Sequence, residues 1–396
     1  MRPHFRAIRL DEFDRCLDLW DQVFRDVPRK YFEAYFYGDP RFRRAYTRVC
    51  ALDGRLVSAV QVCERRVRIG SAELVMGGIG NVATDSDFRG RGYNTRLLKD
   101  SIRIMRRYGM DFSVLFTGIH PFYERLGWRP VAVKSFTGKI KPRLRERETD
   151  KYSIRACDFS TDLDGIKEAY EAFNRLRPLT VCRTPEYWTG YALPRFGEPA
   201  DTLVAESAGS VTGYVVSPCH RDNCSVREIG CIPGHEGCIG PLITRSAARA
   251  RERGVTAMWF HVPEEPEILA AARRVTNDLA PRESLGMMCR VIDMESLGRR
   301  LLPELNRRAA RRKLPPGSFS LDTEMGSLAL TIRNGQVTIG MGDGVHVAVS
   351  QPEFFCLLFG LKSADELGLP IPGDVRQMLL ALFPVAHPVF YLQDHF

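Results

Sequence analysis

The segment Asn81-Val-Ala-Thr-Asp-Ser-Asp-Phe-Arg-Gly-Arg-Gly-Tyr-Asn-Thr95 constrains the fold of this chain more than any other segment. A β-rich run enters a loop of glycines and arginines, and a helical pattern starts directly behind it. Gly90 and Gly92 permit left-handed backbone, so successive N–H groups can point inward at the start of the helix. Arg89 and Arg91 add positive charge. The segment predicts an anion-binding turn, although it is neither a Walker A loop nor a G-x-G-x-x-G dinucleotide turn.

Alternating strand and helix patterns surround this loop and indicate the fold class of residues 1–137. A strand at Phe5–Leu10 precedes a helix that starts at Asp11. A helix is expected at Thr95–Tyr108, and further strands at Thr47–Leu52, Val57–Val67, Leu74–Ala83, Phe112–Phe116 and Val131–Phe136, the last of which completes the unit. Because strands lead repeatedly into helices, this part is α+β or α/β and not a helical bundle.

A second motif, Pro121-Phe-Tyr-Glu-Arg-Leu-Gly-Trp128, follows the predicted strand Phe112–Phe116. The two motifs together resemble the GNAT N-acetyltransferases. The loop resembles their Arg/Gln-x-x-Gly-x-Gly/Ala turn for the pyrophosphate of acetyl-CoA, with Asn94 in place of the final small residue. Tyr123 precedes a Leu-Gly-aromatic triplet, as in their second signature. The resemblance implies a GNAT fold for residues 1–140.

The remainder of the chain extends this resemblance. From Ser153 the order of strands, helices and glycine loop recurs with different residues, and the chain changes character near residue 290. The whole chain resembles the Eis-type (enhanced intracellular survival) acetyltransferases, which implies an α+β fold of tandem GNAT-like domains followed by a sterol-carrier-protein-like α/β domain. The expected domains are 1–145, which binds acetyl-CoA, 146–290, which lacks cofactor, and 291–396, whose end is docked in the active site.

The resemblance also implies roles for individual residues. Tyr123 matches the general acid, and the carboxylate of Phe396 at the end of the chain matches the general base. The residues matching those that hold acetyl-CoA are Val82, Ala83, Thr84, Arg89, Gly90, Arg91, Gly92, Tyr93, Asn94, Thr95, Gly118 and Ile119.

The chemistry implied is direct acyl transfer to an amine, which must lose a proton to attack a thioester. A phenol with an ordinary pKa of about 10 is a competent proton donor at pH 7, whereas an α-carboxylate with a pKa of about 3.5 is a weak base unless burial raises its pKa. His395 adjoins Phe396 and could share the role of the base. The sequence leaves both assignments open.

The acceptor is expected to be a primary amine of a small polyamine or aminoglycoside-like molecule. The predicted contacts with this cation are Trp20, Asp21, Phe24, Asp26 and Asp394, of which Asp394 is the strongest because it adjoins Phe396. A protein lysine remains an alternative acceptor. A lipid- or acyl-CoA-binding carrier or regulatory protein with a vestigial transferase domain is the alternative from another class.

The loop Pro233-Gly-His-Glu-Gly-Cys-Ile-Gly240 of the second unit has no arginine, and Glu236 would repel phosphate. The cysteines around it, Cys219, Cys224, Cys231 and Cys238, lack a C-x-x-C spacing, so structural thiols are favoured over a zinc site and no metal is expected.

Composition excludes several classes of protein. The hydrophobic fraction of 44% argues against disorder, and the net charge of +9 comes from dispersed basic residues, so neither a nucleic-acid partner nor a membrane is expected. The odd number of cysteines, 11, together with a start that lacks an apolar stretch, indicates reduced thiols in the cytoplasm. A homo-oligomer, hexameric as in Eis-type relatives, is expected by resemblance alone.

Overall fold

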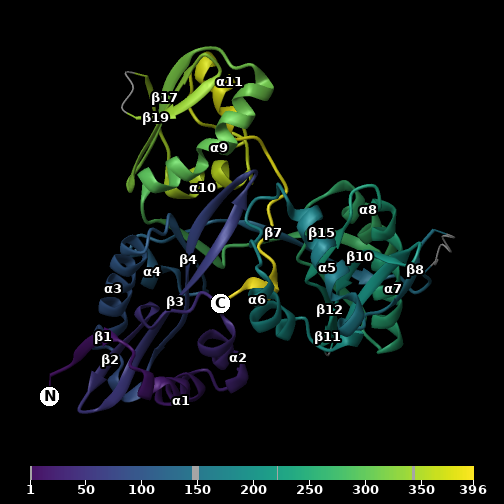
Figure 1. Ribbon diagram of the computed structural model, residues 1–396, viewed down its shortest axis with the longest axis horizontal. Coiled ribbons are helices and arrows are strands. Elements are labelled where there is room, and N and C mark those ends of the chain that lie inside the picture. The colour runs from purple at the N-terminus through teal and green to yellow at the C-terminus, as the bar shows by residue number, and fades with distance from the viewer. Residues whose placement is uncertain (1, 145–150, 221, 341–343) are drawn as a thin grey trace.

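The structure is a computed structural model that describes residues 2–144, 151–220, 222–340 and 344–396. These residues form a mixed α/β architecture with four sheets. Figure 1 shows three lobes: one formed by the start of the chain, a second by its middle, and a third, green and yellow, by most of its last part. The predicted boundary after residue 145 lies outside the described residues.

The first lobe is built on a seven-stranded sheet. Its strands are, in spatial order, β1 (His4–Ala7), β2 (Thr47–Leu52), β3 (Arg55–Ile69), β4 (Ala72–Thr84), β5 (Phe112–Phe116), β16 (Met287–Val291) and β6 (Arg129–Pro130). The hairpin predicted at Asp53-Gly54 joins β2 to β3, and both residues have positive φ. Among the described strands of this sheet, only β4 and β5 pair in parallel.

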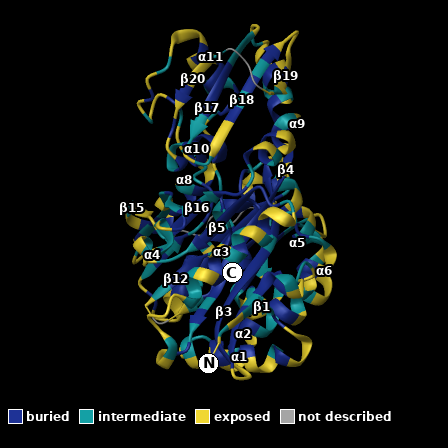
Figure 2. Cartoon of the chain, turned by 90° about the vertical axis from the view of Figure 1, so that its left-hand side faces the viewer, coloured by how far each residue is buried: buried dark blue, intermediate teal, exposed yellow. Residues whose placement is uncertain are grey.

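Helices cover both faces of this sheet. Leu97, Leu98 and Met105 of α3 (Tyr93–Arg107) pack on the face that carries Val60 and Val62. The helix α1 (Phe13–Val23) packs on the opposite face, together with α2 (Arg29–Glu33). Figure 2 shows the strands of this sheet as the buried layer and the outer sides of the helices as exposed.

The strand expected at Val131–Phe136 forms, but in another sheet. It is β7 (Val133–Ile140), which pairs with β14 (Ala257–Phe260) and β15 (Thr276–Ser284) of the middle lobe. Its place beside β5 is taken by β16, which comes from far along the chain. The prediction that this strand completes the first unit is wrong, because an alternating pattern specifies a strand and not the strand that pairs with it.

Among the described residues, the middle lobe contains two sheets, four α-helices and a π-helical turn. One sheet has the order β11 (Cys219–His220), β12 (Asn223–Val226), β14, β7, β15, and the other β13 (Glu228–Cys231), β10 (Ser210–Val216), β9 (Thr202–Ser207), β8 (Ser153–Ala156). The helices are α5 (Phe159–Asn174), α6 (Pro185–Tyr187), the π-helical turn Trp188–Ala192, α7 (Ile239–Glu252) and α8 (Pro266–Val275).

The last lobe begins with α9 (Met294–Arg312), whose predicted apolar stripe of Leu297, Leu301, Leu305 and Ala309 is buried as expected. A four-stranded sheet follows, in the order β19 (Gln336–Ile339), β18 (Gly326–Arg333), β17 (Gly317–Thr323), β20 (Val345–Ala348). The helices α10 (Gln351–Phe359) and α11 (Gly373–Leu382) complete it. The chain then returns to the first lobe, where it ends between α6 and β3 in the view of Figure 1. Among the described helices, none has the length and apolar character needed to span a bilayer.

Candidate active site

The turn between β4 and α3 has the geometry expected for an anion-binding loop. Gly90 and Gly92 each have a φ of 76°, and nothing lies within 4 Å of the positions that their Cβ atoms would occupy. The helix α3 begins at Tyr93, so the unpaired N–H groups of its first turn adjoin this open space. Such groups stabilise a negative charge at a helix N-terminus. The predicted strand, turn and helix geometry is therefore confirmed.

A cavity of about 450 Å³ opens at this turn. It is lined by Val23, Val82, Thr84, Phe88, Phe122, Arg125 and residues 89–95. Of the predicted acetyl-CoA residues, all but Ala83, Gly118 and Ile119 therefore line it. Ala83 is buried, and its carbonyl accepts a hydrogen bond of 2.9 Å from Ser58, whose hydroxyl also bonds Asn94 at 2.7 Å. Ile119 lines an adjoining hollow that shares Phe122 and Arg125 with the cavity.

Arg125 is a lining residue that the sequence did not single out. It lies just after α4 (His120–Glu124) and is exposed, with its guanidinium carbon 5.6 Å from the centroid of the Phe122 ring. Arg89 and Arg91 line the cavity from the turn before α3, and Arg125 adds positive charge from the residue that follows α4. Its position in the second motif, two residues after Tyr123, could have indicated that it lies near the site.

A bulge in β4 adjoins the cavity. Asn81 has a φ of 51°, and the register of β4 against β3 shifts there, between the pairs Ala59–Ala83 and Gln61–Gly80. The Asn81 amide donates a buried hydrogen bond of 2.8 Å to Gln61. Pairing of β4 with β5 runs only from Met76 to Ile79, so β4 continues beyond it to Thr84. A bulge leaves backbone groups outside the ladder, where they can bind a ligand carbonyl.

Tyr123 lies on α4 and is half-buried. Its ring makes edge contacts with Phe122, at 4.9 Å between centroids, and Trp128, at 6.3 Å. Burial raises the pKa of Tyr123 to about 12, so its hydroxyl remains protonated at neutral pH. This keeps it available as a proton donor.

The end of the chain lies on the α1 face of the same sheet. A Cβ on Gly78 would overlap the Phe396 ring, and one on Gly80 would lie 3.0 Å from the Phe396 carboxyl carbon. The His395 ring stacks on Phe116 with centroids 4.0 Å apart. Burial lowers the pKa of His395 to about 4, so this imidazole is neutral at pH 7. The Phe396 carboxyl group therefore lies at the point where β4 and β5 cease to pair.

Comparison with known proteins identifies the first lobe. The family described as an acetyltransferase (GNAT) domain matches residues 4–131. These residues are a GNAT acetyltransferase domain. An uncharacterized N-acetyltransferase of Methanocaldococcus jannaschii is 27% identical over 140 residues, which cover 31% of this chain. The match spans 59% of the length of that curated relative.

Solved structures are similar to the chain beyond its GNAT domain. A probable N-acyltransferase from Enterococcus faecalis has a TM-score of 0.76 at 18% identity, with all of both chains covered. Eis1 from Mycobacterium abscessus has a TM-score of 0.64 at 13% identity, also with all of both chains covered. At these identities the likeness concerns the fold.

Asp394 has a different partner from the one predicted. Its side chain is fully buried, and both oxygens accept hydrogen bonds from Arg183, at 3.0 and 2.8 Å. Tyr187 donates a further bond of 3.1 Å. The prediction that Asp394 anchors a cationic acceptor is corrected, because its charge is already paired with a buried guanidinium.

The other predicted acceptor contacts lie around α1 of the GNAT domain. Trp20 is fully buried and stacks on Phe36, with ring centroids 5.2 Å apart, so it belongs to the core and the prediction of an acceptor contact is wrong. Phe24 is half-buried, and Asp21 and Asp26 are exposed. The α1 residue that lines the cavity is Val23, which the sequence did not single out.

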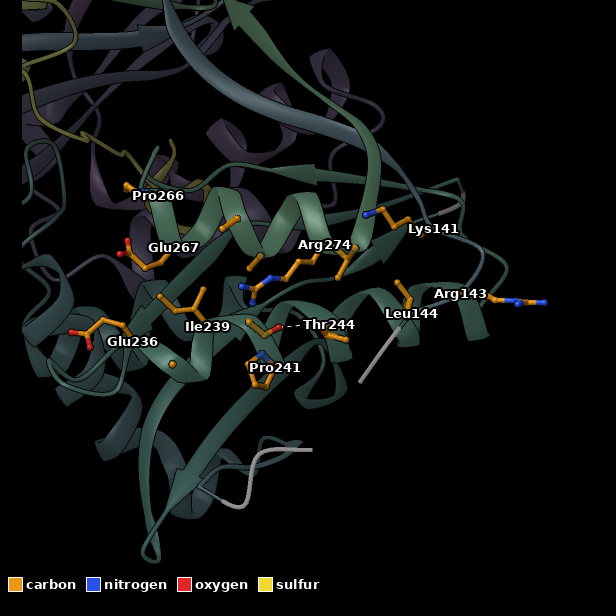
Figure 3. Close-up of a pocket in the computed structure, with 15 residues that line it drawn as sticks. Lys141, Arg143, Leu144, Glu236, Ile239, Pro241, Thr244, Pro266, Glu267 and Arg274 are labelled. Atoms are coloured by element: carbon orange, nitrogen blue, oxygen red, sulfur yellow. Dashed lines mark hydrogen bonds between the residues drawn. The ribbon is translucent and has the colours of Figure 1, made fainter. Parts of the chain in front are cut away.

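A groove of about 930 Å³ separates α7 and α8 in the middle lobe. Figure 3 shows Glu236 and Glu267 at one end of it, Lys141 and Arg143 at the other, and Arg274 between them. The Glu236 side chain accepts a bond of 2.9 Å from the Gly234 N–H, so a carboxylate already binds this turn. That the lobe lacks acetyl-CoA stays a prediction.

The described cysteines of the middle lobe are not gathered into a cluster of possible metal ligands. Within the described ranges, no three His, Cys, Asp or Glu side chains are grouped closely enough to hold a metal ion. Cys219 and Cys224 instead face each other across the β11–β12 pair. All the cysteines that the structure describes are free thiols.

Proposed function

We propose that this chain is an acetyl-CoA-dependent N-acetyltransferase that transfers the acetyl group directly to a primary amine. The observation that carries the proposal is the convergence of three features on one strand end. The arginine-lined cavity lies at the end of β4, the bulge at Asn81 precedes it, and the Phe396 carboxyl group lies beside Gly80.

The cavity suits the phosphates of acetyl-CoA. The space beside Gly90 and Gly92 is open, and Arg89, Arg91 and Arg125 supply positive charge. When bound, acetyl-CoA would supply the thioester, and the residues of β4 and β5 beyond the last pair, Ile79–Leu115, would hold its acyl end. Free N–H groups of the bulge would donate to the acyl oxygen, where negative charge develops during transfer.

Two groups of the chain handle protons in this proposal. The Phe396 carboxylate takes a proton from the incoming ammonium, because only a neutral amine attacks a thioester. The rings of Phe116 and Phe390 lie 5.7 and 5.9 Å from that of Phe396 and restrict water around this end. Tyr123 donates a proton to the departing thiolate, and its raised pKa keeps the hydroxyl protonated.

We extend the proposal to the acceptor, the last domain and the assembly of the chain. We take the acceptor to be a small polyamine or aminoglycoside-like amine, with Asp21 and Asp26 as its exposed acidic contacts. We also propose a sterol-carrier-like last domain, a homo-oligomer and a cytoplasmic location, and no nucleic-acid partner.

The decisive experiment measures thiol release from acetyl-CoA with spermidine, an aminoglycoside and a lysine peptide. Two variants are compared with the wild type: Tyr123→Phe, and a chain extended by Gly-Ser after Phe396. Each should lower kcat/KM by about 10²-fold or more.

The exposed Tyr108→Phe and a Gly-Ser extension before Met1 serve as controls. The acid and base assignments are wrong if both test variants stay within about threefold of wild type. Absence of turnover with every amine, together with tight lipid binding, would favour the carrier alternative.

A further inference from the structure

A buried ion cluster connects the middle lobe to the end of the chain. Arg183 is buried and donates to both oxygens of Glu228, at 2.9 and 2.7 Å, as well as to both oxygens of Asp394. Its guanidinium also lies over the rings of Tyr170 and Trp188, at 4.1 and 4.6 Å. Such geometry is needed to offset the cost of removing these charges from water.

Hydroxyl groups complete this cluster. Tyr214 donates to Glu228 at 2.6 Å, and Tyr187 donates to Asp394. Burial raises the pKa of Glu228, which limits the excess negative charge in the cluster. Loss of either partner of Arg183 would leave it incompletely paired in the interior.

Each of the last three residues has its own partner. Asp394 is held by Arg183, and the His395 carbonyl accepts a bond of 2.7 Å from the Tyr191 hydroxyl. Phe396 lies against Gly78 and Gly80 of the GNAT domain. Arg183, Tyr187 and Tyr191 all come from the middle lobe, so that lobe binds the two residues that precede Phe396.

We propose that Arg183 is a positioning residue, which holds Asp394 so that the Phe396 carboxyl group stands beside Gly80 in the active site. This inference rests on the proposed function and gives the middle lobe a part in the reaction. A displacement of about 1 Å of a catalytic group can cost about 10²-fold in rate. Arg183 would therefore affect turnover without touching either substrate.

The test compares two Asp→Asn substitutions, each of which weakens an ion pair with an arginine of the middle lobe. Asp394→Asn weakens the bond to Arg183, whereas Asp162→Asn weakens the pair between Asp162 and Arg155, whose bonds are 2.6 and 2.8 Å long. With spermidine, an aminoglycoside or a lysine peptide as acceptor, Asp394→Asn should lower kcat about 10- to 100-fold and leave the KM for acetyl-CoA within about twofold. Asp162→Asn should leave both constants within about twofold.

The extended chain provides a second readout, the effect of Asp394→Asn on kcat in the two backgrounds. A general loss of stability would lower kcat in both backgrounds alike. With Gly-Ser after Phe396, the Asp394→Asn substitution should lower kcat no further, because the group that it positions is already displaced. An equal loss in both backgrounds would overturn the proposal. So would a kcat within about threefold of wild type for Asp394→Asn while the extension alone abolishes turnover.

Milder variants keep the proposal testable where Asp394→Asn does not fold. Tyr187→Phe and Tyr191→Phe each remove one hydroxyl bond to the last residues and leave the charges in place. Each should lower kcat about threefold to tenfold, and a double variant without effect would overturn the proposal. Failure of the wild-type protein to acetylate any of the three amines would instead count against the proposed function.

Discussion

The carboxyl carbon of Phe396 lies 3.0 Å from the position that a Cβ atom would occupy on Gly80. Such an approach is closer than ordinary van der Waals contact, so a methyl group at Gly80 would push the chain end away from β4. We expect Gly80→Ala to lower kcat about tenfold with little change in the KM for acetyl-CoA. Steady-state kinetics measure both constants.

The control for this substitution is Gly373→Ala. Gly373 has open space around its Cβ position and lies in the last lobe, at the start of α11. It should behave as wild type. A Gly80→Ala enzyme with wild-type kcat would show that the chain end tolerates displacement, and thus that its close approach is not needed for turnover.

Arg125 should contribute to binding of acetyl-CoA and not to the chemical step. Arg125→Ala removes an exposed positive charge from the lining of the cavity. The KM for acetyl-CoA should rise about five- to twentyfold while kcat stays within about threefold, since the contact is the same in ground and transition states. Arg103→Ala removes an exposed arginine of α3 outside the cavity lining and is the matched control. Equal KM values for the two variants would contradict the assignment.

His395 should make stability depend on pH. Burial lowers its pKa to about 4 in the folded chain, against an ordinary value of 6.5, so the unfolded chain binds more protons between these values. The contribution of His395 to the free energy of unfolding therefore rises with pH across this window and is constant above it. The contribution of His395 is at most about 3 kcal/mol.

Urea denaturation at pH 7 and pH 4.5 measures this contribution. The wild type should lose more stability on acidification than His395→Asn, which cannot take up the proton. His261, whose pKa is also lowered by burial, is present in both proteins and cancels from the comparison. Equal losses in the two proteins would show that the pKa of His395 is not lowered in the folded chain.

Cys219 should be the more reactive of two half-buried thiols. A hydrogen bond with Cys224 and the nearby Arg253 and Arg249 lower the pKa of Cys219 to about 7. Burial raises the pKa of Cys182 to about 12. Because the thiolate is the nucleophile, iodoacetamide at pH 7 should alkylate Cys219 at least about tenfold faster. Mass spectrometry of the two peptides gives the rates, and equal labelling would contradict the lowered pKa.

Much of the geometry of the candidate site could be predicted from the sequence. The turn at residues 89–95 and the half-buried Tyr123 lie where their motifs placed them, because a strand, a glycine turn and a helix are specified by neighbouring residues. The bulge at Asn81 was missed. Asn81 follows Gly77, Gly78 and Gly80, and such residues permit a bulge or a positive φ at several positions without specifying which one adopts it.

Two of the predicted contacts with the acceptor are wrong. Trp20 and Asp394 were chosen by residue type and position along the chain, but both side chains are buried with protein partners. A tryptophan or an aspartate serves equally well in a core or at a surface, so residue type alone does not distinguish the two. Burial is decided by elements that are distant in the sequence.

By itself, the sequence determined most elements of this protein and the glycine turn at residues 89–95, since local backbone preferences and hydrophobic periodicity act over a few residues. Only the tertiary structure decided that β7 leaves the first sheet for the middle lobe and that β16 replaces it. It also decided that Asp394 pairs with Arg183, 211 residues earlier. The physical reason is the same in each case. Many strands can form hydrogen bonds with the edge of a sheet, and many arginines can pair with a carboxylate. Which strand and which arginine do so is decided when the whole chain packs.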